Sequence, residues 1–132
     1  MPCNILIQTD NDKKWAQIKK ILAHQGIHSV QKSANAQHTL DAVQNSETPI
    51  MLLIDRYIEE VNTLDFIENV RSTGVEHNKK VLVFVMIDQF YAEDILTMHH
   101  NKIIDGYIFF PYTDDTGKLL EKIWKKEMES IH

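Results

Sequence analysis

The sequence predicts a single α/β domain in which helices cover both faces of a parallel β-sheet. Strand-like and helix-like stretches alternate five times along the 132 residues. The run Ile50–Ile54 is wholly apolar, which is typical of a strand buried on both faces of such a sheet. Aspartates follow this run and the earlier apolar run Ile5–Ile7, at the strand ends where open α/β sheets bind ligands.

The first two strand–helix units occupy the amino-terminal third of the chain. A strand is expected at 4–8, a helix over about 12–25, and Gly26 as the stop of that helix. Four apolar residues share one face of this helix: Trp15, Ile18, Ile21 and Leu22. A short strand at 28–32 and a helix over about 35–45, whose apolar residues recur with helical spacing, form the second unit.

The third unit begins after Pro49. The buried strand at 50–54 is followed by a helix expected over about 63–72. Asn62 is the candidate N-cap of this helix, and Gly74 lies beyond its expected end.

The last two units complete the pattern. Residues 81–87 are the most β-prone run in the chain, and a helix over about 91–102 follows them. The strand at 107–110 is closed by Pro111, and the last helix starts near Asp114. One domain over residues 1–132, with its core at about 4–126, is therefore expected.

This (βα)₅ rhythm predicts right-handed crossovers and a flavodoxin-like strand order of 2-1-3-4-5. In that order the strands at 4–8 and 50–54 are neighbours, so Asp10 and Asp55 should converge at the carboxyl edge of the sheet. Two carboxylates at one place favour a site for a divalent cation or a phosphoryl group.

Composition narrows the classes of partner. The net charge of −5 argues against binding a phosphate backbone, so no nucleic-acid partner is expected. The apolar runs are too short to cross a bilayer, so no membrane partner is expected. The single Cys3 excludes an internal disulfide and fits a reducing compartment, which predicts a cytoplasmic location. The lysines near the start of the first helix, Lys13 and Lys14, are interpreted as part of a solvated face.

From about Asn4 to Lys126, the chain resembles a response-regulator receiver domain. The resemblance is carried by Asp10, Asp55, the pair Val70-Arg71 and the aromatic Tyr107. It implies that Asp55 is the phosphoacceptor in a two-component or phosphorelay system. A histidine kinase or a phosphotransfer protein would supply the phosphoryl group. It also implies a Mg²⁺ ion held by Asp10, Asp55 and the backbone carbonyl of Tyr57.

Three positions depart from the pattern of this family. Thr9 replaces the first of the paired acids, so Mg²⁺ should bind weakly. The hydroxyl position of the fourth strand is Val85, or Met86 in the alternative register, and neither side chain donates a hydrogen bond. The lysine position before the last proline is Phe110. The phosphoryl clamp is therefore degenerate, which indicates a divergent or pseudo-receiver domain.

The neighbours of these positions raise two further expectations. Arg56 could replace the missing cation, although pairing with Glu59 or Glu60 is the favoured interpretation. Phe110 should make the pocket more apolar and raise the cost of ionising Asp55. The aromatic residue of the fifth strand is retained as Tyr107. A valine at position 85, however, offers no hydroxyl that a phosphoryl group on Asp55 could attract, so the conformational switch that the resemblance implies is not expected.

The aromatic residues near the last strand could also form a contact surface. Phe109 or Phe110 is expected in the core, with Tyr107 and Tyr112 nearer the surface. A homodimer through the fourth helix, fifth strand and fifth helix is permitted by this arrangement, as is a downstream protein partner.

Two signalling functions follow, a receiver phosphorylated on Asp55 and a phosphorylation-independent interaction module on the same fold. The degenerate clamp favours weak or absent dependence on phosphorylation. A flavodoxin-like or phosphatase-like enzyme is a remote alternative, suggested only by the spacing of Asp10 and Asp12. Acids after the first strand would repel a flavin phosphate, and no Gly-x-Gly-x-x-Gly is present, so neither flavin nor nucleotide is expected.

Overall fold

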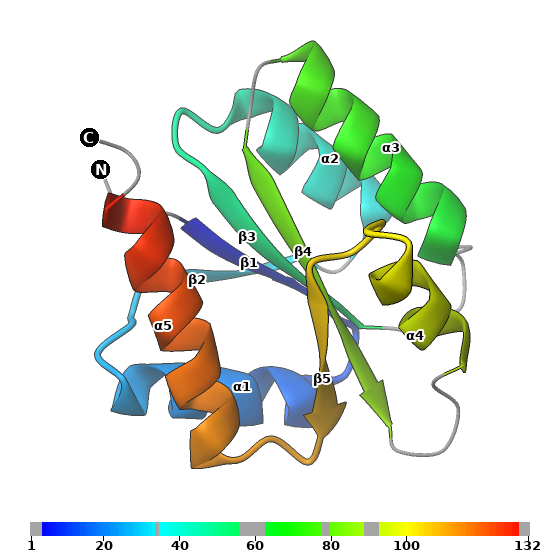
Figure 1. Cartoon of the computed structure of the whole chain (residues 1–132). Coiled ribbons are helices and arrows are strands. Elements are labelled where there is room, and N and C mark those ends of the chain that lie inside the picture. Colours follow the sequence, from blue (N-terminus) through cyan, green and yellow to red (C-terminus); the bar gives the residue numbers. More distant parts are fainter. Residues whose placement is uncertain (1–3, 34, 56–62, 78–79, 89–92, 130–132) are drawn as a thin grey trace.

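The computed structural model describes residues 4–33, 35–55, 63–77, 80–88 and 93–129. Five parallel strands form one sheet in the order β2-β1-β3-β4-β5 (Figure 1), which confirms the predicted order. The strands are β1 (Asn4–Gln8), β2 (Val30–Ser33), β3 (Ile50–Asp55), β4 (Val81–Asp88) and β5 (Gly106–Phe110). All six residues of β3 are buried, as expected for a central strand covered on both faces.

Helices cover both faces of the sheet (Figure 1). They are α1 (Asp12–His24), α2 (Ala36–Asn45), α3 (Thr63–Glu76), α4 (Glu93–His100) and α5 (Asp114–Glu129). The pair α1 and α5 packs together on one face, the pair α2 and α3 on the other, and α4 contacts β5. Among the described residues, none of these helices has both the length and the apolar content needed to cross a membrane.

Two helix ends differ from those predicted. Gly74 lies inside α3 rather than beyond it, because the helical hydrogen bonds continue past it. The last of them runs from the His77 N–H to the Thr73 carbonyl, at 3.0 Å. A glycine within a helix costs only about 1 kcal/mol, so it does not by itself end one. The helix α4 ends at His100, two residues earlier than predicted, because Lys102 adopts a left-handed φ of 62°, with its N–H bonded to the His99 carbonyl.

The strands alternate their side chains between two apolar layers. Leu52, Ile54 and Val85 belong to the layer under α2 and α3, which also contains Phe66 and Val70. The opposite layer, under α1 and α5, contains a second set from the same strands and helices: Ile7, Ile18, Leu22, Met51, Leu53, Met86, Ile108 and Leu120. The side chain at position 55 follows Met51 and Leu53 in this alternation and therefore lies on the α1 side of the sheet.

Of the four aromatic residues near β5, Tyr112 is placed differently from the prediction. Tyr112, expected near the surface, is only 5% exposed and packs in the layer under α1 and α5. Its ring makes an edge-on contact with Phe110, with ring centroids 5.4 Å apart, and Phe110 is half-buried against the same layer. Phe109 is exposed, and Tyr107 is half-buried on the opposite layer. Strand alternation sends 108 and 110 inward together, and the chain beyond Pro111 folds back over them.

Candidate functional site

Asp55 ends the central strand β3 at the carboxyl edge of the sheet and is only 2% exposed. Gln8, the last residue of β1, pairs with Ile54. The segment that follows Gln8 therefore lies beside Asp55. Its neighbour on β4 is Met86, which pairs with Asp55 directly. A buried carboxylate needs compensating hydrogen bonds or charge, because transfer out of water strongly disfavours its ionised form.

Both carboxylate oxygens of Asp55 have partners. The Thr9 hydroxyl donates a hydrogen bond to Oδ2 at 2.7 Å. The Lys14 ammonium lies 3.2 Å from Oδ1 and forms an ion pair with it. Thr9 is fully buried and Lys14 is 6% exposed, so this cluster is enclosed by protein. Charge-assisted hydrogen bonds of this kind are stronger than those between neutral groups.

The loop after β1 sets the geometry of both partners. The Asn11 side chain caps α1 by accepting a hydrogen bond from the Lys14 N–H at 3.0 Å. The Asn11 N–H in turn donates to the Thr9 hydroxyl oxygen at 3.1 Å, which leaves the hydroxyl proton for Asp55. One short segment therefore anchors the helix, aims the hydroxyl and places Lys14 in the first turn of α1.

The interpretation of Lys14 as part of a solvated helix face is wrong. Lys14, Ile18, Ile21 and Leu22 are the buried residues of α1, and their spacing places all four on one face. Residue 14 precedes Ile18 by four positions, so the apolar stripe itself could have predicted an inward-facing lysine. Its side chain lies on this buried face, and its charged end reaches Asp55. Lys13, one position away, is exposed.

Phe110 lies close to this cation. The Lys14 ammonium is 5.7 Å from the centroid of the Phe110 ring, within the range of a cation–π contact. Phe110 stands at the position where the receiver-domain pattern has a lysine. The positive charge at Asp55 thus comes from α1, and the end of β5 contributes an aromatic surface beside that charge.

The structure distinguishes the two candidates for the hydroxyl position on β4. Met86 pairs with Asp55 and belongs to the layer under α1 and α5, on the same side of the sheet. Val85 belongs to the opposite layer and pairs with Tyr107 on β5. Both are completely buried. The β4 side chain beside Asp55 is therefore a thioether, which donates no hydrogen bond.

Asp10 is exposed, in contrast to Asp55, and the β1-loop residue that donates to the Asp55 carboxylate is Thr9. Asp12, also exposed, pairs with Lys32 at 2.9 Å. The hydrogen bond from Lys32, with its positive charge, lowers the pKa of the Asp12 carboxyl below its ordinary value of 3.8. Tyr57, Arg56, Glu59 and Glu60 lie outside the described residues.

The described side chains do not fit a Mg²⁺ ion in this arrangement. An ammonium group already neutralises Asp55, and a divalent cation bound there would meet its positive charge. Within the described ranges, no group of three or more His, Cys, Asp and Glu side chains is arranged to hold a metal. The shared ion between Asp10 and Asp55 stays a prediction.

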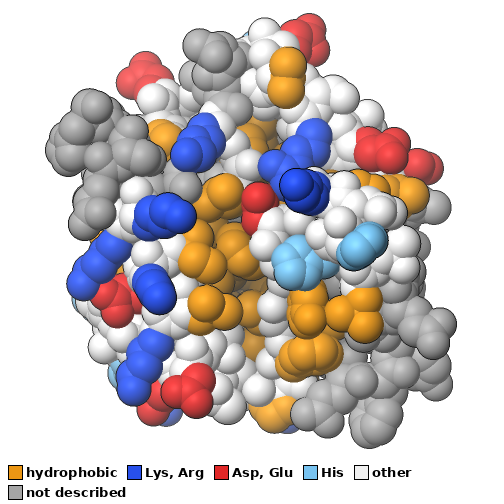
Figure 2. Space-filling model, viewed as in Figure 1, with side chains coloured by type: hydrophobic (Ala, Val, Ile, Leu, Met, Phe, Trp, Pro, Cys, Tyr) orange, Lys and Arg blue, Asp and Glu red, His pale blue; other side chains and the backbone are white. Residues whose placement is uncertain are grey.

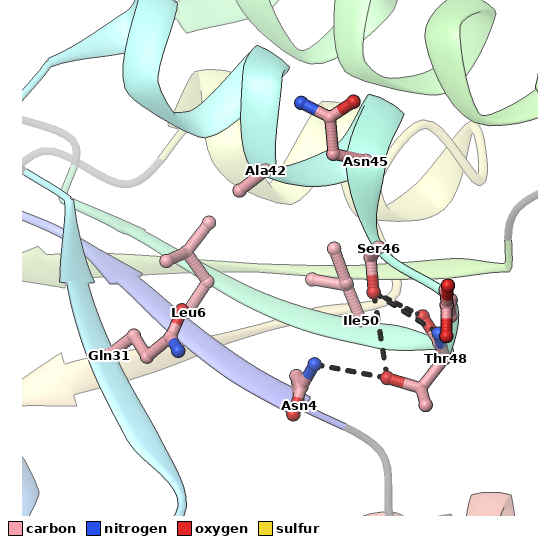
Figure 3. Close-up of a pocket in the computed structure, with 9 residues that line it drawn as sticks. Asn4, Leu6, Gln31, Ala42, Asn45, Ser46, Thr48 and Ile50 are labelled. Carbon is pink, nitrogen blue, oxygen red and sulfur yellow. Dashed lines mark hydrogen bonds between the residues drawn. The ribbon is translucent and has the colours of Figure 1, made fainter.

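A cavity lies at the opposite, amino-terminal edge of the sheet, between α2 and strands β1 and β2 (Figure 3). Its volume is about 340 Å³, and Leu6, Ala42 and Ile50 form its apolar lining. The polar groups at its rim bond to one another: the Asn4 amide donates to the Thr48 hydroxyl at 3.0 Å, as Figure 3 shows. This cavity shares no residue with the Asp55 cluster.

Solved structures place this architecture among known proteins. The response regulator receiver domain protein (CheY-like) from Methanospirillum hungatei JF-1 matches with a TM-score of 0.72 at 14% identity, covering 96% of this chain and 97% of that one. Chemotaxis protein CheY4 of Vibrio cholerae matches with a TM-score of 0.72 at 14% identity, over 95% and 98% of the two chains. The chain has the receiver-domain fold.

Other comparisons add little about activity. A structure of adenylate cyclase from Rhodopirellula baltica is also similar to this chain, with a TM-score of 0.78 at 11% identity, over 99% of this chain and 93% of that chain. No protein-family model and no curated protein matches the sequence. At these identities the similarity to solved structures shows the fold alone. What the Asp55 cluster can do chemically depends on its own side chains.

Proposed function

We propose that this chain is a signalling receiver module of a two-component or phosphorelay system, with Asp55 in the phosphoacceptor position and output that depends weakly or not at all on phosphorylation. The observation that carries the proposal is the buried Asp55, engaged on both oxygens by Thr9 and Lys14. The receiver fold supports the position of Asp55, and the cluster around it supports the weak dependence.

Phosphorylation requires an Asp55 oxygen to attack a phosphoryl donor in line. Here the attacking carboxylate is hydrogen-bonded by Thr9 and paired with Lys14, and both contacts stabilise its ground state. Neither Met86 nor Phe110 can donate a hydrogen bond to the incoming phosphoryl oxygens. Losing one preorganised donor at a developing charge typically costs about 3 to 4 kcal/mol in the barrier, so acyl-phosphate formation should be slow.

A phosphorylated receiver is the second candidate, and one observation favours it. The Lys14 ammonium is close enough to Asp55 to meet the charge of a phosphoryl group attached there. In that case Lys14 would supply from α1 the positive charge that Phe110 cannot supply from β5.

The partner in either case would be a protein, either a histidine kinase or phosphotransfer protein upstream or a downstream protein. Exposed apolar side chains are present on α4, β5 and α5, namely Leu96, Phe109 and Leu119. Figure 2 shows apolar side chains gathered on this side of the molecule, with basic side chains beside them over α5, whose basic residues are all lysines. This surface could equally join two copies of the chain.

The test is incubation with acetyl phosphate and Mg²⁺, read by intact-mass spectrometry. The proposal predicts no phosphoryl adduct, or an adduct at only a small fraction of the protein, in wild type. The Asp55→Asn variant is the control for modification elsewhere. A stoichiometric adduct that disappears in Asp55→Asn would contradict weak phosphorylation and establish the second candidate.

A further inference from the structure

We infer that the Lys14 ammonium is the resident cation of this site, in the place that a receiver fold otherwise gives to a divalent metal ion at the phosphoacceptor aspartate. The cation bound by the Asp55 carboxylate is then a lysine side chain rather than a metal ion. This inference deepens the proposed function, since it rests on Asp55 being in the phosphoacceptor position.

Burial makes some counter-charge at Asp55 necessary. With 2% of its surface exposed, the carboxylate has lost its hydration and is stabilised only by what the protein supplies. Lys14 supplies a full positive charge at 3.2 Å from Oδ1, and Thr9 supplies a hydrogen bond at 2.7 Å to Oδ2. The carboxylate is thereby neutralised within the chain.

Lys14 is fixed in this position by several independent contacts. Its backbone N–H is bonded to the Asn11 cap, and its side chain lies on the buried face of α1. Its ammonium is 5.7 Å from the centroid of the Phe110 ring. A lysine held at its backbone, its stem and its charged end loses little further entropy by staying paired, so displacing it is costly.

A divalent cation and Lys14 would therefore compete for one carboxylate. A Mg²⁺ ion at Asp55, with the exposed Asp10 as its second carboxylate, would lie within a few ångströms of the ammonium group if both stayed in place. The repulsion between them is strong because the site is enclosed. We expect wild type to bind Mg²⁺ at least about tenfold more weakly than a variant with a neutral side chain at position 14, since the ammonium must first leave.

The experiment is a calorimetric titration with Mg²⁺, repeated with Mn²⁺, in the absence of any phosphoryl donor. Four proteins are compared: wild type, Lys14→Gln, Lys14→Gln/Asp55→Asn and Lys13→Gln. Lys13→Gln is the matched control, because it removes the same charge from an exposed neighbouring position on the same turn. Lys14→Gln should bind the metal at least about tenfold more tightly than wild type or Lys13→Gln, and the gain should vanish in the double variant.

Two results would overturn the inference. One is equal metal affinity in wild type and Lys14→Gln, whether both bind or neither does. The other is an Asp55-dependent rise in the melting temperature of wild type with added Mg²⁺, a measurement that needs no Lys14 variant to fold. Neither experiment contains a phosphoryl donor, so both are read separately from the adduct assay above, which detects the acyl phosphate itself.

Discussion

At the scale of single residues, the account depends on how a buried ion pair behaves. Two charges removed from water gain little net stability over well-packed apolar side chains, but removing one partner leaves the other charge uncompensated. Lys14 and Asp55 are 6% and 2% exposed, so solvent cannot replace a missing partner. The pair is best understood as a constraint that holds the two side chains in place against each other.

Replacing Lys14 by methionine should therefore lower the free energy of unfolding by about 3 to 5 kcal/mol, because the buried Asp55 carboxylate loses the ammonium group that lies 3.2 Å from its Oδ1. Adding Asp55→Asn should recover most of that loss, since the amide oxygen can still accept from Thr9. Urea denaturation measures both values. Lys13→Met, at the exposed neighbour, should change the free energy by less than about 0.5 kcal/mol. A Lys14→Met protein as stable as Lys13→Met would show that the pair is not buried as described.

At the scale of elements, the placement of α1 depends on its contact with α5. Gly117 on α5 faces Ile21 on α1, and a Cβ at position 117 would lie 2.5 Å from the Ile21 Cγ2 and 3.2 Å from the Ile21 carbonyl oxygen. The backbone atom cannot turn away as a side chain can. The glycine therefore permits the close approach of the two helices that cover this face of the sheet.

Gly117→Ala should destabilise the protein by about 1 to 3 kcal/mol through overpacking, although alanine is the better helix former. Thermal unfolding monitored by circular dichroism measures the change. Lys118→Ala, at the exposed neighbouring position, is the control and should have little effect. If Gly117→Ala were more stable than wild type, helix propensity would outweigh the contact, and the close α1–α5 packing would be disproved.

At the scale of the whole molecule, the sequence carried the fold but only part of the site. The strand order and the position of Asp55 followed from alternating apolar runs, because burial of a parallel sheet leaves a strong local pattern. Lys14 was missed because a lysine is normally solvated, and only its spacing from Ile18 marked it as inward-facing. The Thr9–Asp55 bond joins residues 46 positions apart, and no local pattern reports which hydroxyl meets which carboxylate.

The burial of Tyr112 was missed for a related reason. It lies beyond the last strand, where no periodicity applies, and its N–H is fixed by the Gln17 side chain at 2.7 Å, across 95 positions of the chain. Long-range side-chain contacts of this kind decide the detail of the site, whereas short-range patterns decide the sheet.

The most direct test of the central claim is a crystal structure grown with Mn²⁺, with an anomalous difference map calculated at the manganese absorption edge. The account predicts the Lys14 ammonium within ion-pair distance of the Asp55 carboxylate and no anomalous peak beside that carboxylate. A manganese peak coordinated by Asp55, with the Lys14 side chain turned away from it, would contradict the account.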